Sequence, residues 1–167
     1  MLSRFRLSAL LSALAALAAG CVSNSAPLDS YQSPPAGAPV AYLKGSQVTE
    51  AGLFGSDHTG FVALVDLKPV YDAQSNWSGP IALTPGKHTI VGEYRYSNFM
   101  ARAYLPLDAK AGVTYQLMIK NGAEPPPSTH LYCDFWIVDQ STMTSVTQVY
   151  RQQATGGKKG TVFNVPY

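Results

Sequence analysis

Apolar and polar residues alternate along short segments of the chain from Val40 onward, and clusters of Gly, Pro, Asn, Asp and Ser separate these segments. Alternation with a period of two places every second side chain on one face of a β-strand. No segment after residue 20 requires a helix of normal length. The pattern predicts strands at 40–49, 61–67, 81–83, 88–97, 99–108, 113–120, 130–139 and 146–150.

Segments 88–97 and 99–108 predict a hairpin with a defined register. A tight turn at Ser97-Asn98 pairs residues whose numbers sum to 195. The resulting pairs are Tyr94–Ala101 and Ile90–Leu105 on the apolar face and Glu93–Arg102 on the solvent-facing side. An opposite-charge pair across two strands stabilises a sheet by a few tenths of a kcal/mol, roughly. Both faces therefore agree with one register.

Turn signals between the strands complete the fold prediction. Pro85 presets its own backbone angle, and Gly86 supplies the positive φ that a type II turn needs at its third position. The Gly-rich segment 50–60 is predicted as a loop. We therefore expect an all-β fold, a single antiparallel two-sheet β-sandwich over 40–151, followed by a flexible tail or edge strand at 152–167.

The first 20 residues have the composition of an export signal. Arg4 and Arg6 precede an uncharged apolar run from Leu7 to Ala19. The run is shorter than the about 20 apolar residues that a membrane-spanning helix needs. A short apolar core behind a basic start, ending in small residues, is typical of a signal peptide. We expect residues 1–20 to be removed from the mature protein.

The end of this run resembles the lipobox of bacterial lipoproteins, in the sequence Leu17-Ala18-Ala19-Gly20-Cys21. The resemblance implies that Cys21 becomes the mature N-terminus and carries acyl chains, which anchor it in membrane lipid. Val22, and not Asp, follows the cysteine. In lipoproteins this favours transfer to the outer membrane, so we expect a location in the cell envelope, at the periplasmic face or the cell surface.

The segment that follows the anchor differs in composition from the strands. Residues 21–39 are rich in Ser, Pro, Ala and Gly and contain one charge, Asp29. Such a composition cannot bury enough apolar surface to fold by itself. We predict a flexible tether that holds the folded domain a short distance from the membrane.

Charge and cysteine content limit the partners and the chemistry. The chain has 12 Lys and Arg against 10 Asp and Glu, and loss of Arg4 and Arg6 with the leader leaves ten of each. A neutral mature chain lacks the basic face that nucleic acid requires, so we expect no nucleic-acid partner. With Cys21 acylated, Cys133 has no intrachain partner. A buried, apolar role for Cys133 is favoured over a reactive thiol or an intermolecular disulfide.

Residues 80–96, with the sequence PIALTPGKHTIVGEYRY, resemble the core of PEGA-like and transthyretin-like β-sandwich modules. Small bacterial lipoproteins of this kind continue with a turn and strand such as Ala111–Tyr115 and a later segment such as Trp136–Asp139. The resemblance implies the sandwich fold and a non-catalytic module. It implies no particular ligand, because these modules share no catalytic residues.

The residue types that carry catalysis or bind metals are few and scattered. Asp57 and His58, together with His130 or Asp134, form the one candidate metal site, but no pair has a tight ligand spacing. His88 follows a turn and is expected to make local hydrogen bonds. No Gly-x-Ser-x-Gly elbow or Gly-rich phosphate loop occurs. We therefore expect no catalytic residue, no metal and no cofactor, and a protein that is not an enzyme.

Aromatic residues outside the predicted core are the remaining candidates for a binding surface. Trp77 lies in the loop segment QSNWSG, and exposure is also expected for Tyr31, Tyr42 and Tyr104. Exposed aromatic side chains often contact proteins or carbohydrates; alternatively, Trp77 folds back over the end of the sandwich. The sequence predicts an accessory or binding module of the envelope with a protein partner. The alternative is a glycan or small-ligand binder that uses Trp77.

Overall fold

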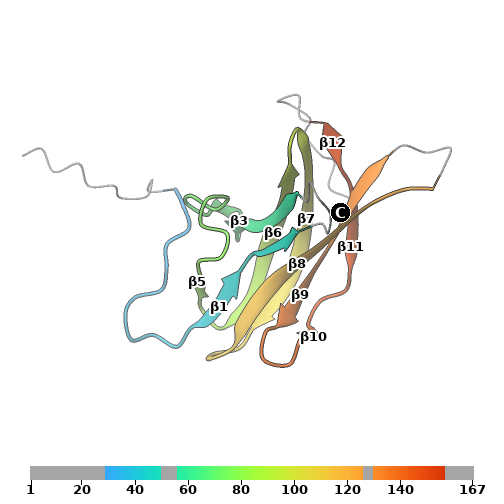
Figure 1. Cartoon of the computed structure of the whole chain (residues 1–167). Coiled ribbons are helices and arrows are strands. Elements are labelled where there is room, and N and C mark those ends of the chain that lie inside the picture. The colour runs from blue at the N-terminus through green and yellow to red at the C-terminus, as the bar shows by residue number, and fades with distance from the viewer. Residues whose placement is uncertain (1–28, 50–55, 126–129, 157–167) are drawn as a thin grey trace, which may run out of the picture.

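The computed structural model describes residues 29–49, 56–125 and 130–156. Within these residues all regular structure is β-strand, arranged in two six-stranded sheets that pack around one core. Figure 1 shows β1, β8 and β9 in one layer and β3, β6 and β7 in the other. The predicted all-β, two-sheet sandwich is therefore confirmed. No helix in the described part of the chain is long and apolar enough to cross a membrane.

We name each sheet after a central strand. The β8 sheet consists, in spatial order, of β10 (Thr144–Ser145), β9 (Leu131–Asp139), β8 (Thr114–Ala123), β1 (Ala41–Lys44) and β5 (Ile81–Leu83), with β11 (Tyr150–Gln153) also paired to β9. The β6 sheet consists of β12 (Thr155–Gly156), β7 (Phe99–Ala109), β6 (Gly86–Tyr96), β3 (Asp57–Val65) and β2 (Ser46–Thr49), with β4 (Lys68–Pro69) paired to β3. All pairs are antiparallel except β1 with β8, which is parallel.

The hairpin of β6 and β7 has the predicted register. Tyr96 pairs with Phe99 across a two-residue turn in which Ser97 has a φ of 50°. The three predicted pairs all occur, namely Tyr94–Ala101, Ile90–Leu105 and Glu93–Arg102. Gly86 has the predicted positive φ, 125°, where the chain passes from β5 in one sheet to β6 in the other.

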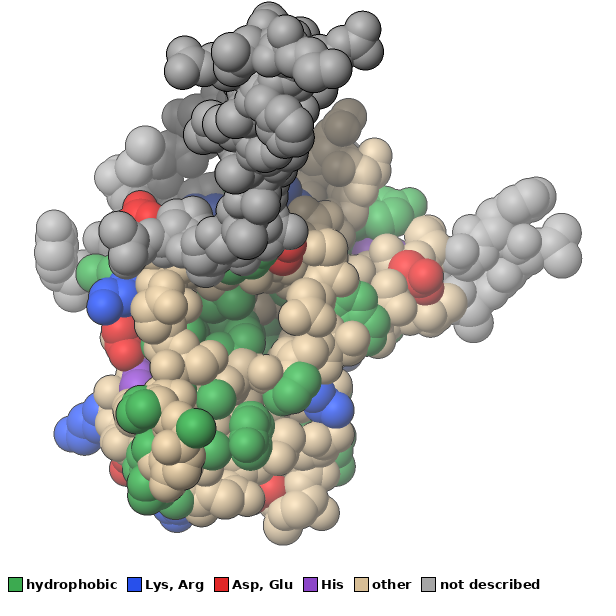
Figure 2. Space-filling view, turned by 90° about the vertical axis from the view of Figure 1, so that its left-hand side faces the viewer, with side chains coloured by type: hydrophobic (Ala, Val, Ile, Leu, Met, Phe, Trp, Pro, Cys, Tyr) green, Lys and Arg blue, Asp and Glu red, His purple; other side chains and the backbone are tan. Residues whose placement is uncertain are grey.

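The core lies between the inward faces of the two sheets. Its largest fully buried apolar side chains are Tyr115, Phe135, Leu43, Leu83, Ile90, Leu105, Leu117 and Ile137. A Cβ atom at Gly92 of β6 would come within 3.1 Å of Leu117 and 3.2 Å of Phe135 from the opposite sheet. Glycine at this position therefore lets the two sheets approach closely. On the side of the molecule shown in Figure 2, further hydrophobic side chains gather near the middle, and Lys and Arg lie towards the margins.

The prediction of one strand at 40–49 was wrong. The segment forms β1 and β2, which belong to different sheets, and the chain changes sheets at Gly45. A Cβ atom at Gly45 would lie 2.3 Å from the Gly60 carbonyl oxygen and 2.8 Å from that of Trp77. Only glycine fits this crossing, and alternation alone does not reveal it because both halves have the same period.

The prediction for 61–67 was wrong at both ends. The strand β3 begins at Asp57, inside the segment predicted as a loop, and ends at Val65. Asp66 and Leu67 have φ values of 50° and 65° and form a two-residue turn into β4. Positive φ at both turn positions matches the twist of the flanking strands, which is why such turns close hairpins.

The predicted tether at 21–39 is corrected over its described part. Ser30 is buried, the Tyr31 amide donates to the Pro69 carbonyl at 2.8 Å, and the Tyr31 hydroxyl donates to the Ala82 carbonyl at 2.8 Å. Tyr31 also packs against the core, so residues 29–31 belong to the folded domain. The composition did not reveal this because one aromatic residue with two backbone partners is enough to attach the segment.

The C-terminal boundary also differs from the prediction. The strand expected at 146–150 does not form over that range, because β10 ends at Ser145 and β11 begins at Tyr150, the last residue of the predicted strand. β11 pairs with β9 and β12 pairs with the start of β7, so the sandwich continues past residue 151 to Gly156. The segment 157–167, which includes the end of the predicted tail, lies outside the described residues.

Candidate functional site

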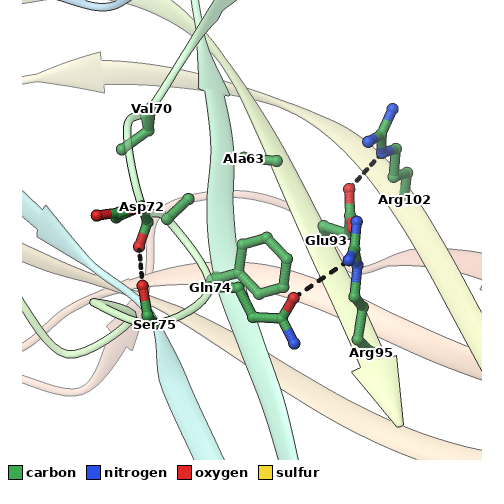
Figure 3. Close-up of a pocket in the computed structure, with 10 residues that line it drawn as sticks. Ala63, Val70, Asp72, Gln74, Ser75, Glu93, Arg95 and Arg102 are labelled. Atoms are coloured by element: carbon green, nitrogen blue, oxygen red, sulfur yellow. Dashed lines mark hydrogen bonds and ion pairs between the residues drawn. The ribbon is translucent and has the colours of Figure 1, made fainter. Parts of the chain in front are cut away.

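A groove of about 630 Å³ lies on the outer face of the β6 sheet. Strands β3, β6 and β7 form its floor, and the segment that follows β4 forms the wall that faces them (Figure 3). The lining residues are Phe61, Ala63, Val70, Asp72, Ala73, Gln74, Ser75, Glu93, Arg95 and Arg102. The volume falls in the range of small-ligand sites, roughly 300–1,000 Å³.

The strand pattern explains why the floor side chains share one face. Alternation along β6 puts Glu93 and Arg95 on the face opposite to the core, and the hairpin register sets Arg102 beside Glu93. On the other side, Phe61 pairs with Glu93. The register between β3 and β6 shifts at Ala63, which is an extra residue in β3. Phe61 and Ala63 stand two positions apart in one strand, so their side chains share a face, and both line the groove.

Glu93 is the buried centre of the groove, with 1% of its side chain exposed. Its Oε1 accepts a hydrogen bond from Arg95 Nε and its Oε2 accepts one from Arg102 Nε, each at 2.5 Å. The two arginine side chains are 47% and 39% exposed. Arg95 also donates from Nη1 to Gln74 Oε1 at 3.2 Å and lies 5.8 Å above the ring of Phe61.

Several arginine donors remain available in this arrangement. Among the described residues, no acceptor is hydrogen-bonded to Nη2 of Arg95 or to either terminal nitrogen of Arg102. Two guanidinium groups and one carboxylate leave this end of the groove with a net charge of +1. Figure 3 shows the side chain of Asp72 on the opposite wall, directed away from the arginines. The groove can therefore accept an anionic group.

The sequence predicted the pairing of Glu93 with Arg102 correctly, but it predicted the exposure of Glu93 wrongly. Glu93 and Arg102 face each other as expected, but Glu93 is buried and not solvent-facing. Both oxygens of the carboxylate are bonded to arginine Nε atoms, and 1% of the side chain is exposed. The groove itself was missed, because Gln74 and Ser75 come from a segment that carries no strand pattern. The alternation that put Glu93, Arg95 and Arg102 on one face was the available signal.

The ten described residues that line the groove include no histidine and no cysteine. Ser75 contributes a hydroxyl group, and it donates to the backbone carbonyl of Asp72 at 3.1 Å. Nucleophilic catalysis requires a hydroxyl or thiol activated by an adjacent base. In the groove, the Ser75 hydroxyl donates to a backbone carbonyl, and the Glu93 carboxylate is bound by two guanidinium groups. This arrangement suits the binding of a charged group.

His88 and Asp66 form a second polar cluster at one end of the β6 sheet. His88 Nδ1 lies 2.7 Å from Asp66 Oδ2, and His88 Nε2 lies 2.7 Å from the Thr84 carbonyl oxygen. Because a carbonyl oxygen only accepts, Nε2 carries a proton here. Burial raises the pKa of Asp66, but hydrogen bonds from the Thr89 amide and from His88 outweigh it and hold that pKa below its usual value. The expected local hydrogen bond is the one to Thr84, four residues away, whereas the contact with Asp66 joins two turns that are 22 residues apart.

The candidate metal ligands have separate partners. His58 is buried with Nδ1 2.8 Å from the Tyr94 hydroxyl, and His130 lies 3.6 Å from Glu124 Oε2. Asp134 binds Arg151 on the outer face of the β8 sheet. Across the described ranges, no group of three or more His, Cys, Asp or Glu side chains is arranged to hold a metal ion.

Cys133 is fully buried, with its sulfur facing the core. Burial raises the pKa of this thiol to about 12, so the reactive thiolate is not formed near neutral pH. The interpretation as a buried apolar residue is confirmed. The predicted lipid site, Cys21, lies outside the described residues.

The predicted exposure of the aromatic side chains is confirmed for two tyrosines, which lie in different sheets. Tyr42 and Tyr104 are 39% and 40% exposed, whereas the expectation for Tyr31 was wrong because it packs on the core. Trp77 is half-buried in the segment that contributes one wall of the groove, but it does not line the groove. Its carbonyl accepts a hydrogen bond from the Gly45 amide at 2.7 Å, at the point where the chain changes sheets.

Comparison with known proteins does not assign a function to this groove. No family model, no curated protein and no solved structure matches the chain.

Proposed function

We propose that this chain is a lipid-anchored, non-catalytic binding module of the bacterial cell envelope. The observation that supports binding is the groove beside Glu93, where two arginines keep unused donors. The proposal of an anchor rests on the leader at 1–20 and on Cys21, the acylated residue in this scheme. Membrane lipid is then the first partner, and a protein of the envelope is the second.

The outer membrane is the proposed location, because Val22 and not Asp follows Cys21. The likeness to PEGA-like and transthyretin-like modules remains part of the proposal, and the two-sheet sandwich is compatible with it. In this scheme the binding surface is the outer face of the β6 sheet, with its groove.

The attachment of Tyr31 to the sandwich limits how far the domain can stand from an anchor at Cys21. Eight peptide units separate Cys21 from Asp29, the first described residue. Fully extended, they span at most about 28 Å. The anchored module would therefore work close to the membrane surface.

A second candidate function is a periplasmic or surface binder of a glycan or small ligand. It is favoured by the position of Trp77, which is half-buried in the same segment whose residues 72–75 line the groove. A ligand that shifts this segment would change the fluorescence of Trp77. The chain has two tryptophans, so a Trp77→Phe variant would separate that signal from the one of Trp136.

The test is to compare the wild-type chain with Cys21→Ser in intact cells. We expect incorporation of labelled palmitate and recovery with outer membranes for the wild type, and loss of both for the variant. Cross-linking followed by affinity recovery is expected to show a discrete envelope protein that is absent with the variant. Equal fractionation of both proteins without palmitate would overturn the anchor, and recovery of the same abundant proteins from both would overturn the accessory role.

A further inference from the structure

We propose that the groove beside Glu93 binds the carboxylate of a peptide that has an apolar side chain next to that carboxylate. This inference rests on the proposed binding function and specifies its ligand. It depends on three features of the groove: how the arginines are held, what charge remains, and what the rest of the lining offers.

Glu93 orients both guanidinium groups through their inner edges. It accepts from Nε of Arg95 and from Nε of Arg102, so the terminal nitrogens of Arg102 and Nη2 of Arg95 are left for a ligand. Gln74 accepts from the other terminal nitrogen of Arg95 and fixes that group further. A guanidinium is planar and rigid, so fixing one edge also aims the others. Little side-chain freedom is then lost when a ligand binds.

The charge of the site matches a single carboxylate. The two arginines and Glu93 sum to +1, and the carboxylate of Asp72 is directed away from them (Figure 3). Terminal guanidinium nitrogens donate two parallel hydrogen bonds to a carboxylate, which is their preferred geometry in proteins. Bound there, a carboxylate would neutralise the site.

The remaining lining decides against a bare inorganic anion. Four of the groove residues are apolar, namely Phe61, Ala63, Val70 and Ala73. An inorganic anion would leave this apolar wall in contact with water, whereas an apolar side chain would cover it. A carboxylate with an apolar neighbour occurs at the C-terminus of a peptide or at an internal Glu or Asp. The shared chemistry is the same for both sources.

The first experiment uses the wild-type full-length chain in detergent and three peptides that carry rhodamine at the N-terminus. The peptides are Ala-Ala-Leu with a free carboxylate, Ala-Ala-Leu-amide, and Ala-Glu-Leu-amide. Fluorescence anisotropy is expected to show at least one carboxylate peptide binding about tenfold more tightly than Ala-Ala-Leu-amide, with affinity falling as salt rises. Tighter binding of the first indicates a C-terminal source and tighter binding of the third a side-chain source. Equal affinity for all three, or no binding up to about 1 mM, overturns the proposal.

Two matched substitutions in one segment locate the site without touching the ion pairs. Ala73→Trp fills the groove, whereas Ser78→Trp adds the same side chain at an exposed position outside it. We expect Ala73→Trp to weaken carboxylate binding about tenfold and Ser78→Trp to leave it unchanged. Equal effects would overturn the assignment to this groove. Loss of peptide binding with retention of the envelope partner would separate a failure here from a failure of the proposed function.

Discussion

Two buried carboxylates lie on the outer faces of the two sheets, and their arginine partners hold them differently. Asp134 of β9 accepts two hydrogen bonds from one guanidinium, Arg151 Nε to Oδ1 at 2.7 Å and Nη2 to Oδ2 at 2.8 Å. Glu93 of β6 accepts one hydrogen bond from each of two arginines. The first arrangement sums to zero charge, and the second leaves a positive charge and unused donors.

The surroundings of the two carboxylates differ in the same way as their hydrogen bonds. The Arg151 guanidinium lies 3.9 Å above the ring of Tyr132, across two strands that pair directly. The Arg151 side chain therefore connects β11 to β9 within the β8 sheet. Glu93 instead lines a groove whose opposite wall is formed by the segment 70–75 (Figure 3). Asp134 and Arg151 thus satisfy each other within the fold, whereas the arginines beside Glu93 keep donors that the proposed ligand would use.

The largest expected effect comes from removing both cations around Glu93. In Arg95→Gln/Arg102→Gln the carboxylate stays buried without a charged partner, and we expect a loss of about 3 kcal/mol in the free energy of unfolding. Urea denaturation measures this loss. Adding Glu93→Gln to the double variant should restore most of it, because no buried charge remains. A double variant as stable as the wild type would contradict the description of Glu93 as a charge that depends on these arginines.

A smaller loss of stability is expected when the ion pair between Asp134 and Arg151 is removed, and this loss should depend on pH. Hydrogen bonds from Arg151 hold the pKa of Asp134 below its usual value of 3.8. A lowered folded-state pKa contributes stability above the usual value, and this contribution is lost as the pH falls through the folded value. Arg151→Gln should therefore be less stable than the wild type at pH 7, with the difference shrinking below pH 3.8. Thermal unfolding of both proteins across this range is the measurement, and a constant difference would argue against the ion pair as its cause.

The smallest effect is expected for Gln74→Ala. Gln74 accepts one exposed hydrogen bond from Arg95, whereas Glu93 orients that side chain from the buried side. The free energy of unfolding should change by less than about 0.5 kcal/mol. Affinity for the carboxylate peptide should fall by about twofold. A loss as large as that of Ala73→Trp would mean that the segment 70–75, and not Glu93, holds the arginines in place.

The sequence predicted the floor of the groove better than its wall. Alternation and one tight turn were enough for the pairing of Glu93 with Arg102, because a two-residue hairpin turn sets the register of both strands. The burial of Glu93 could not be predicted in this way, because alternation places Glu93 on the face away from the core. The opposite wall of the groove could not be predicted either, because residues 70–75 follow a turn with positive φ at Asp66 and Leu67 and carry no period of their own.

Two further errors have the same origin in contacts between distant segments. Gly45 fits against the backbone of Gly60 and Trp77, and Tyr31 bonds to Pro69 and Ala82. Alternation placed Gly45 in the middle of a strand, and composition placed Tyr31 in a tether. Neither description includes the distant backbone that decides the local structure.

The sequence by itself determined the β class, the two-sheet architecture and the β6–β7 register, because a period of two and a tight turn act over neighbouring residues. It also carries the leader and Cys21, on which the proposed anchor rests. Only the tertiary structure decided where the chain changes sheets, which carboxylate is buried, and that two arginines keep donors beside a groove. These outcomes depend on which segments pack over a sheet face, and packing of that kind leaves no period along the chain.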